Sequence, residues 1–143
     1  MATINPYLTY DGNCEEAFEF YKSVFGGEYA YLGRFKDMPS DKPVPKEEEN
    51  KIMHVALPIS SETVLMGSDA SASFGPPCVQ GTNFSISVNA ETEEEAKRLF
   101  SELSAGGQVQ MSMEKMFWGA LFGLFTDKYG ITWMVNYEYE DQA

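Results

Sequence analysis

Apolar residues recur with a helical period at two places in the chain. Each stripe fills positions i, i+3, i+4 and i+7, which is the spacing of one helix face. The members are Ala17, Phe20, Tyr21 and Val24 in the first stripe, and Ala96, Leu99, Phe100 and Leu103 in the second. Asn13 and Thr92 precede the stripes as candidate N-caps, each with a glutamate three residues later. Glycine pairs at 26–27 and 106–107 predict the helix ends. Because these features match in order and in register, they predict an internal repeat.

Runs with a period of two surround both predicted helices and predict β-strands. They lie at 4–10, 28–36, 52–60 and 63–68 in the first half, and at 83–89, 108–113, 121–126 and 131–139 in the second. Each half is therefore predicted as β-α-β-β-β. This order makes the chain an α+β protein with a largely antiparallel sheet whose one face is covered by helices.

The expected organisation is one domain over residues 1–143. Module one is placed at 1–69, a connector at 70–81 and module two at 82–143. The polar segment 37–50 contains three prolines and three consecutive glutamates. It fits either a solvated loop or a lid over a site.

The strand parity divides the side chains between two faces of the sheet. In the run 52–60 the odd positions are expected beneath the helices, with Ile52, His54 and Ala56 on the opposite face. That opposite face collects Asn5, Tyr7, His54, Asn83, Ser85, Met134 and Asn136. Polar groups mixed with apolar bulk suit a small-molecule cavity. The same pattern also fits a solvated sheet face, or one covered by a second chain.

Composition limits the classes of partner. Lys and Arg total 10 and Asp and Glu total 22, so the net charge of −12 argues against nucleic acid and against anionic membranes. No apolar run approaches the about 18 residues that span a bilayer. No signal peptide precedes the first predicted strand, so we expect a cytoplasmic protein. Two cysteines, Cys14 and Cys78, cannot form a disulfide framework.

His54 is the only histidine, which excludes any site with two or three histidines from one chain. No Cys-x-x-Cys, Gly-x-Gly-x-x-Gly, P-loop or Gly-x-Ser-x-Gly motif occurs either. His54 itself fits two roles equally well. It is either a structural histidine with a partner, or a residue that binds a ligand.

Three motifs together carry a resemblance to a known family. They are residues 10–21 (YDGNCEEAFEFY), residues 65–69 (LMGSD), and residues 117–136, which contain FWG and DKYGITWMVN. The chain resembles the PhnB-like branch of the vicinal oxygen chelate superfamily, whose members are often labelled demethylubiquinone methyltransferase. The resemblance implies the glyoxalase/bleomycin resistance/dihydroxybiphenyl dioxygenase fold, with two modules in a cup-shaped, mixed, largely antiparallel sheet. It also implies a homodimer.

In metal-dependent members of that superfamily, four strands supply the ligands of a divalent ion. The corresponding positions here are Asn5, Met66, Asn83 and Met134, which offer neither imidazole nor carboxylate. Asn5 and Asn83 are expected at equivalent places in the two halves. We therefore expect no metal. Methyl transfer from S-adenosylmethionine usually relies on a glycine-rich turn in a parallel sheet. The turn at residues 10–13 lacks that pattern, so we expect no organic cofactor.

The first functional hypothesis is a metal-independent protein that binds a small, partly aromatic or planar molecule. The residues expected to bind it are Asn5, Tyr7, His54, Asn83, Trp118, Phe122, Met134 and Asn136. The alternative is an enzyme of isomerase or lyase type with His54 as general base, or a metal-assisted one if the ligand positions are misassigned. In such an enzyme Arg34 is either an anchor for an anionic group or a surface residue. A third hypothesis is an interaction module whose role is dimerisation or docking.

Overall fold

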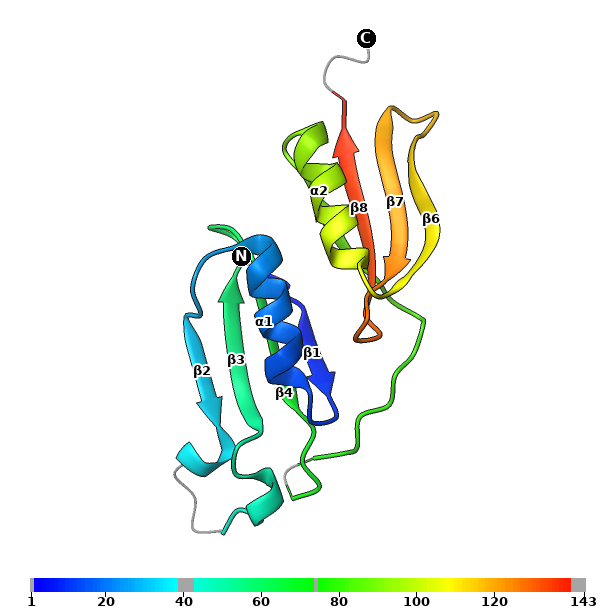
Figure 1. The fold of residues 1–143 in the computed structure, drawn as a ribbon. Helices are drawn as coiled ribbons and strands as arrows, with labels where there is room; N and C mark the ends of the chain where they lie inside the picture. The colour runs from blue at the N-terminus through cyan, green and yellow to red at the C-terminus, as the bar shows by residue number, and fades with distance from the viewer. Residues whose placement is uncertain (1, 39–42, 74, 140–143) are drawn as a thin grey trace. The chain divides into compact units, whose positions relative to one another are not determined.

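The computed structural model describes residues 2–38, 43–73 and 75–139 (Figure 1). The chain divides into two compact units, Met1–Val79 and Gln80–Ala143. Residues 39–42 of the segment predicted as loop or lid, and residue 74 of the connector, lie outside the described residues. The described parts of that loop include a 3-10 turn at Lys46–Glu48, and another 3-10 turn, Phe35–Asp37, takes the end of the predicted strand 28–36 and the first residue of the loop.

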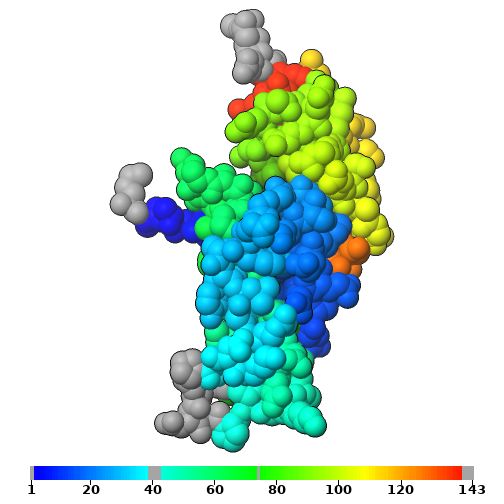
Figure 2. Space-filling model, turned by 60° about the vertical axis from the view of Figure 1, so that its left-hand side comes forward, coloured from blue at the N-terminus to red at the C-terminus, as the bar shows by residue number. Residues whose placement is uncertain are grey.

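The first unit is a four-stranded sheet with one helix. Its elements are β1 (Tyr7–Tyr10), α1 (Cys14–Phe25), β2 (Tyr31–Arg34), β3 (Ile52–Pro58) and β4 (Val64–Asp69). The strand order is β1-β4-β3-β2, with β1 parallel to β4 and the other pairs antiparallel. Helix α1 lies across one face of the sheet and buries the predicted positions Ala17, Tyr21 and Val24 (Figure 1). In the space-filling view the α1 and β2 segments lie at the surface of this unit (Figure 2).

The second unit has the same plan. Its elements are β5 (Ile86–Asn89), α2 (Glu93–Ser104), β6 (Gln108–Lys115), β7 (Ala120–Thr126) and β8 (Thr132–Glu138). The order is β5-β8-β7-β6, and β5 is parallel to β8. The α+β class and the β-α-β-β-β order are thus confirmed, with one mixed sheet in each unit. Each helix of the described chain has 12 residues, and neither is long and apolar enough to cross a membrane.

Strand register makes the repeat explicit and corrects one detail of it. Tyr7 lies opposite Met66 in the first sheet, and Ser87 lies opposite Met134 in the second, so Tyr7 and Ser87 are equivalent. Asn5 stands two positions before Tyr7, and the residue two positions before Ser87 is Ser85. Asn83 therefore does not take the place of Asn5 in the second module.

The two helices begin in different ways. The Thr92 hydroxyl accepts from the Glu95 amide at 3.0 Å, so the predicted cap of α2 is confirmed. The Asn13 side chain makes no such bond at α1. Its place is taken by Asp69, a buried carboxylate whose Oδ1 accepts from the amides of Gly12 and Cys14 at 2.9 Å each.

An irregularity in β3 overturns part of the parity prediction. Gly33 lies opposite His54, but the next residue of β2, Arg34, lies opposite Ile52. Met53 is therefore an extra residue in β3, and such a bulge reverses the side of the residues beyond it. Ile52 is accordingly buried, with 1% of its surface exposed, and does not join the open face.

Candidate functional site

The face of the first sheet opposite α1 is lined by alternate residues of four strands. Gly67 and Val55 lie opposite each other on the helix side, where a side chain at Gly67 would meet Phe18 of α1. The alternate residues therefore lie on the open face. They form one row across the sheet, which consists of Tyr7, Met66, Ala56 and Tyr31.

His54 lies on this open face between two tyrosines. The Tyr7 hydroxyl is 3.1 Å from His54 Nδ1, and the two rings stack with centroids 5.5 Å apart and planes at 21°. The Tyr31 ring lies on the other side, with its centroid 5.7 Å from that of His54. The three rings come from β1, β2 and β3, so the sheet itself brings them together. We call Tyr7, His54 and Tyr31 the aromatic cluster.

Gly33 makes room for the cluster. It lies opposite His54, and a Cβ added there would be 2.6 Å from the Tyr31 hydroxyl. The Tyr31 ring therefore folds along its own strand over the glycine. The sequence analysis did not include Tyr31 in the site. The signal that was available is an aromatic residue two positions from a glycine, on the same strand and the same parity.

The cluster offers both stacking surface and one directed polar atom. Tyr7 and Tyr31 are each 48% exposed, and His54 is half-buried. Within the part of the chain that the structure describes, no hydrogen bond occupies His54 Nε2. If the tyrosine donates to Nδ1, Nε2 carries the proton and donates to a ligand. If Nδ1 donates to the tyrosine, Nε2 accepts.

The open face of the second sheet is built in the same way. A side chain at Gly123 would meet Phe100 of α2, so the alternate residues Phe122 and Leu124 lie on the opposite face. Leu124 lies opposite Met134, and Phe122 opposite Asn136. Trp118, in the hairpin before β7, contacts the Phe122 ring edge-on at 6.1 Å between centroids.

The predicted site residues are therefore distributed over two units. Tyr7 and His54 are brought together in the first, and Trp118 and Phe122 in the second. Met134 and Asn136 lie on the same open face as Phe122. The two remaining residues differ from these. Asn5 precedes β1, and its Oδ1 accepts from the Val64 amide at 3.0 Å. Asn83 is exposed and precedes β5.

The four positions that correspond to metal ligands do not fit a divalent ion. The Asn5 carbonyl is already used by the Val64 amide, and Met66 and Met134 offer only thioethers, which favour soft metals. Among the residues that the structure describes, no group of three or more His, Cys, Asp or Glu side chains is placed to hold a metal.

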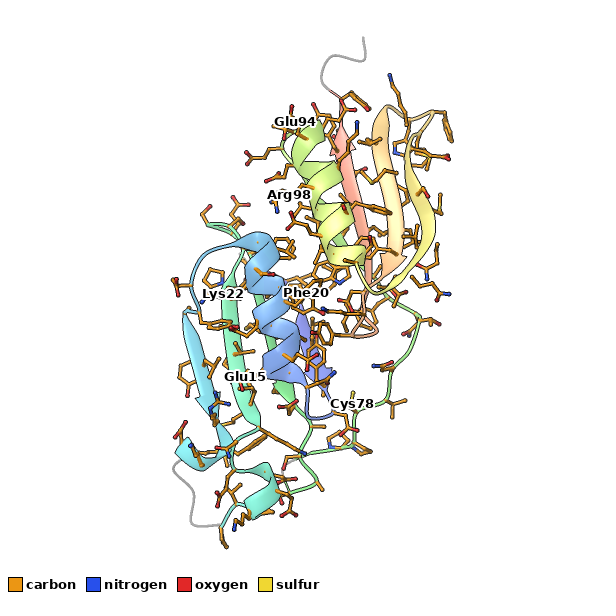
Figure 3. All side chains as sticks on the ribbon, viewed as in Figure 1. Glu15, Phe20, Lys22, Cys78, Glu94 and Arg98 are labelled. Atoms are coloured by element: carbon orange, nitrogen blue, oxygen red, sulfur yellow. The ribbon has the colours of Figure 1, made fainter. Side chains whose placement is uncertain are left out.

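Arg34 is held by the protein itself. Its guanidinium makes a two-pronged contact with Glu15, at 2.9 and 2.7 Å, and donates to the Asn50 carbonyl at 2.9 Å. Glu15 lies at the start of α1 (Figure 3). The Arg34 hydrogen bonds lower the pKa of Glu15, and Glu15 raises the pKa of Arg34. Of the two interpretations of Arg34, these contacts favour the surface residue over the anchor for a ligand.

Neither cysteine has the character of a reactive thiolate. Cys14 is fully buried, and burial raises the pKa of its thiol far above the usual range. Cys78 lies in the connector (Figure 3), donates to the Thr9 carbonyl at 3.3 Å, and has a pKa raised by burial. Nucleophilic thiols need the opposite shift.

Comparison with known proteins finds relatives that match nearly the whole chain. A family model described as 3-demethylubiquinone-9 3-methyltransferase matches residues 2–136. Protein YjdN of Escherichia coli is 33% identical over 141 residues, with 93% of each chain covered. The crystal structure of protein PA1353 from Pseudomonas aeruginosa is 41% identical with a TM-score of 0.84, covering 96% of this chain and 98% of that one.

Two further structures extend the likeness. A PhnB protein from Bacillus cereus is 26% identical with a TM-score of 0.72, covering 95% of this chain and 99% of that chain. A glyoxalase-related enzyme from Fulvimarina pelagi is 17% identical with a TM-score of 0.64, covering 96% and 89%. The latter likeness concerns the fold alone.

Proposed function

The chain belongs to the family described as 3-demethylubiquinone-9 3-methyltransferase, a PhnB-like branch of the glyoxalase/bleomycin resistance superfamily, and we propose that it binds a small planar or partly aromatic molecule without a metal ion. The observation that carries the proposal is the aromatic cluster on the first sheet. It presents two half-exposed tyrosine rings around a histidine with one nitrogen available.

The energetics of the cluster favour a flat ligand. Stacked or edge-to-face aromatic pairs contribute about 0.5–1.5 kcal/mol beyond the area they bury. A ring placed on Tyr7 or Tyr31 gains this term, and a polar substituent reaching His54 Nε2 gains a hydrogen bond. The Tyr7 hydroxyl already fixes the imidazole, so little side-chain entropy remains to be lost on binding.

The methyltransferase description is not part of this proposal. The amides of Gly12 and Cys14, at the first strand-to-helix turn, both donate to Asp69. They are thus not available to anchor the polar groups of a nucleoside cofactor at the start of α1.

A thermal-shift screen tests the proposal. Planar aromatic compounds should raise the melting temperature of the full chain equally with and without a chelator. For a compound that stacks on the aromatic cluster, His54→Ala and Tyr31→Ala should abolish the shift, whereas Tyr29→Phe should keep it, because Tyr29 bonds Glu19 away from the cluster. Failure of every planar compound to stabilise the protein, or stabilisation that requires added metal, would overturn the proposal.

The second candidate function is an enzyme of isomerase or lyase type with His54 as general base. It is favoured by the Tyr7 contact at Nδ1, because a histidine held at one nitrogen presents the other in a fixed direction. Its test is deuterium uptake by a bound compound with an acidic C–H. Uptake should be catalysed by the wild-type protein and lost in His54→Gln, while binding without uptake would leave only the first function.

A further inference from the structure

An amide pair lies beside two aromatic rings on the open face of the second sheet. Asn136 Nδ2 donates to Asn89 Oδ1 at 3.2 Å, and the two residues are opposite each other in the β5–β8 pair. Phe122 is opposite Asn136 on the other side of β8, and Trp118 packs on Phe122. Asn89, Asn136 and Phe122 therefore form one row across three strands. We call these three residues the amide row.

The hydrogen bond between the two asparagines leaves part of each side-chain amide available to a ligand. Each side-chain amide has two N–H donors and one carbonyl acceptor. The bond between the pair uses one carbonyl and one N–H. Among the residues that the structure describes, Asn136 Oδ1 and the Asn89 amino group bond nothing else. Had Asn89 been the donor, the pair would still retain one free carbonyl and one free amino group.

We propose that the amide row binds a planar molecule through an edge with one N–H donor beside one acceptor, as in an aromatic carboxamide, a lactam or an amidine-like heterocycle. This inference goes beyond the proposed function, because it adds a second binding surface, on the other unit, and names the class of ligand that this surface takes. Paired donor and acceptor contacts from asparagine discriminate planar edges strongly, as they do for adenine. The Phe122 and Trp118 rings supply the stacking surface for the same molecule.

An exposed carboxylate near the amide row narrows the chemical class of the ligand further. Glu114 lies opposite Phe122 in the β6–β7 pair and is exposed. A carboxylate at that position repels an anionic ring substituent. The ligand edge is therefore an uncharged amide rather than its isosteric carboxylate, which in addition lacks the N–H donor.

Benzamide and benzoate form a matched pair of probes, because they share shape and differ in the edge. The titration uses the intact chain and follows tryptophan fluorescence. Trp133 is buried and bonded to Asp127, whereas Trp118 is 56% exposed, so a quenching ligand acts mainly on Trp118. Benzamide should bind about tenfold more tightly than benzoate.

Asn89→Asp keeps the side-chain shape but removes the amino group that donates to the ligand, and Asn136→Leu removes the carbonyl oxygen that accepts from it. Each should weaken benzamide about tenfold. Asn13→Asp makes the same charge change in the first unit, where Asn13 makes no capping bond, and should leave the affinity unchanged. Thermal melting of each variant checks that it folds, and the benzamide-to-benzoate ratio of the wild-type chain needs no variant at all.

Three results would overturn the inference alone. The first is equal binding of benzoate and benzamide, and the second is binding of neither while other planar compounds stabilise the chain. The third is a benzamide affinity that survives both asparagine variants, which would make the amide pair a structural link between β5 and β8. If no planar compound binds anywhere on the protein, the proposed function fails as well, so the two failures are distinguishable.

Discussion

At the scale of single residues, Asp69 organises the first unit more than any other polar side chain that the structure describes. It is 4% exposed, and its two oxygens accept three backbone amides, from Gly12, Cys14 and Ile52. One carboxylate at the end of β4 thus joins the turn before α1 to the start of β3. Because Asp69 accepts these amides, the side chain of Asn13 at the cap position of α1 is not needed to accept them.

Asp69→Ala should lower the free energy of unfolding by about 3 kcal/mol, because two buried amides and one part-buried amide lose their acceptor. Urea denaturation followed by circular dichroism measures it. Asp11→Ala is the matched control, since Asp11 is exposed and should change the stability by less than about 0.5 kcal/mol. Equal effects of the two substitutions would contradict this role of Asp69.

The Glu15–Arg34 pair should make stability depend weakly on pH. The folded state lowers the pKa of Glu15 from its ordinary value of 4.5, chiefly through the Arg34 hydrogen bonds. A lowered folded-state pKa contributes stability that is complete above that ordinary value and is lost as the pH falls through the lowered one. Both side chains are partly exposed, so solvent screening limits the contribution to about 0.5 kcal/mol. Stability curves of wild type and Glu15→Gln should differ at pH 7 and converge in acid. A constant difference at every pH would contradict the ionic origin.

At the scale of elements, the contact between α1 and β4 depends on a missing side chain. A Cβ at Gly67 would lie 2.7 Å from the Phe18 ring and 2.8 Å from the Leu8 carbonyl oxygen. The backbone oxygen cannot move without disturbing the β1–β4 ladder. The glycine in the motif at 65–69 therefore has a packing reason.

Gly67→Ala should destabilise the protein by about 2–3 kcal/mol through overpacking. Gly75→Ala is the control, because nothing lies within 4 Å of a Cβ there. Thermal unfolding of the two variants provides the comparison. A Gly67→Ala protein as stable as the control would show that α1 can move away from the sheet at little cost.

Local sequence patterns predicted the helices and strands, but they did not predict features that depend on residues far apart in the sequence. The stripe at 17–24 and the Thr92 cap depend only on neighbours in sequence. The cap is confirmed, and so is the stripe except at Phe20, which is only half-buried. The Asp69 cap joins β4 to the distant start of α1, and the burial of Ile52 follows from a bulge against β2. Neither leaves a periodic signal in one sequence.

At the scale of the whole molecule, the β3–β4 hairpin of the first unit and the β7–β8 hairpin of the second are equivalent but carry different side chains on their open faces. Ala56 lies opposite Met66 in the first unit, and Leu124 lies opposite Met134 in the second. When these two pairs are matched, Phe122 takes the place of His54. The repeat preserves the register and the helix-facing core, while the open faces differ, one with an imidazole and the other with an amide pair.

The candidate site, like the fold, could be predicted only where it depends on local strand parity. Parity placed Tyr7 and His54 on one face, and they do touch. It did not select Tyr31, because that position depends on Gly33 opposite His54. It also counted Asn5 as available, although the residue bonds the backbone amide of Val64, a partner far along the chain that only the fold reveals.

The β6 edge bears on how two copies of the chain associate. In the strand order of the described residues, β6 has a neighbour on one side only, and Val109 and Met111 on it are 46% and 42% exposed. The hairpin that follows exposes 97% of Phe117. An unpaired strand edge with apolar side chains is a template for pairing with another chain, and exposed apolar groups that lie together mark contact sites.

We therefore predict a homodimer that uses this edge. Light scattering should give twice the chain mass of 16.0 kDa, and Met111→Lys together with Phe117→Ser should give the monomer. Val79→Ser, which alters a residue 85% exposed in the connector, should leave the dimer intact. A wild-type monomer at tens of micromolar would remove the edge from consideration, whereas a dimer insensitive to both β6-edge substitutions would mean that the copies associate through another surface.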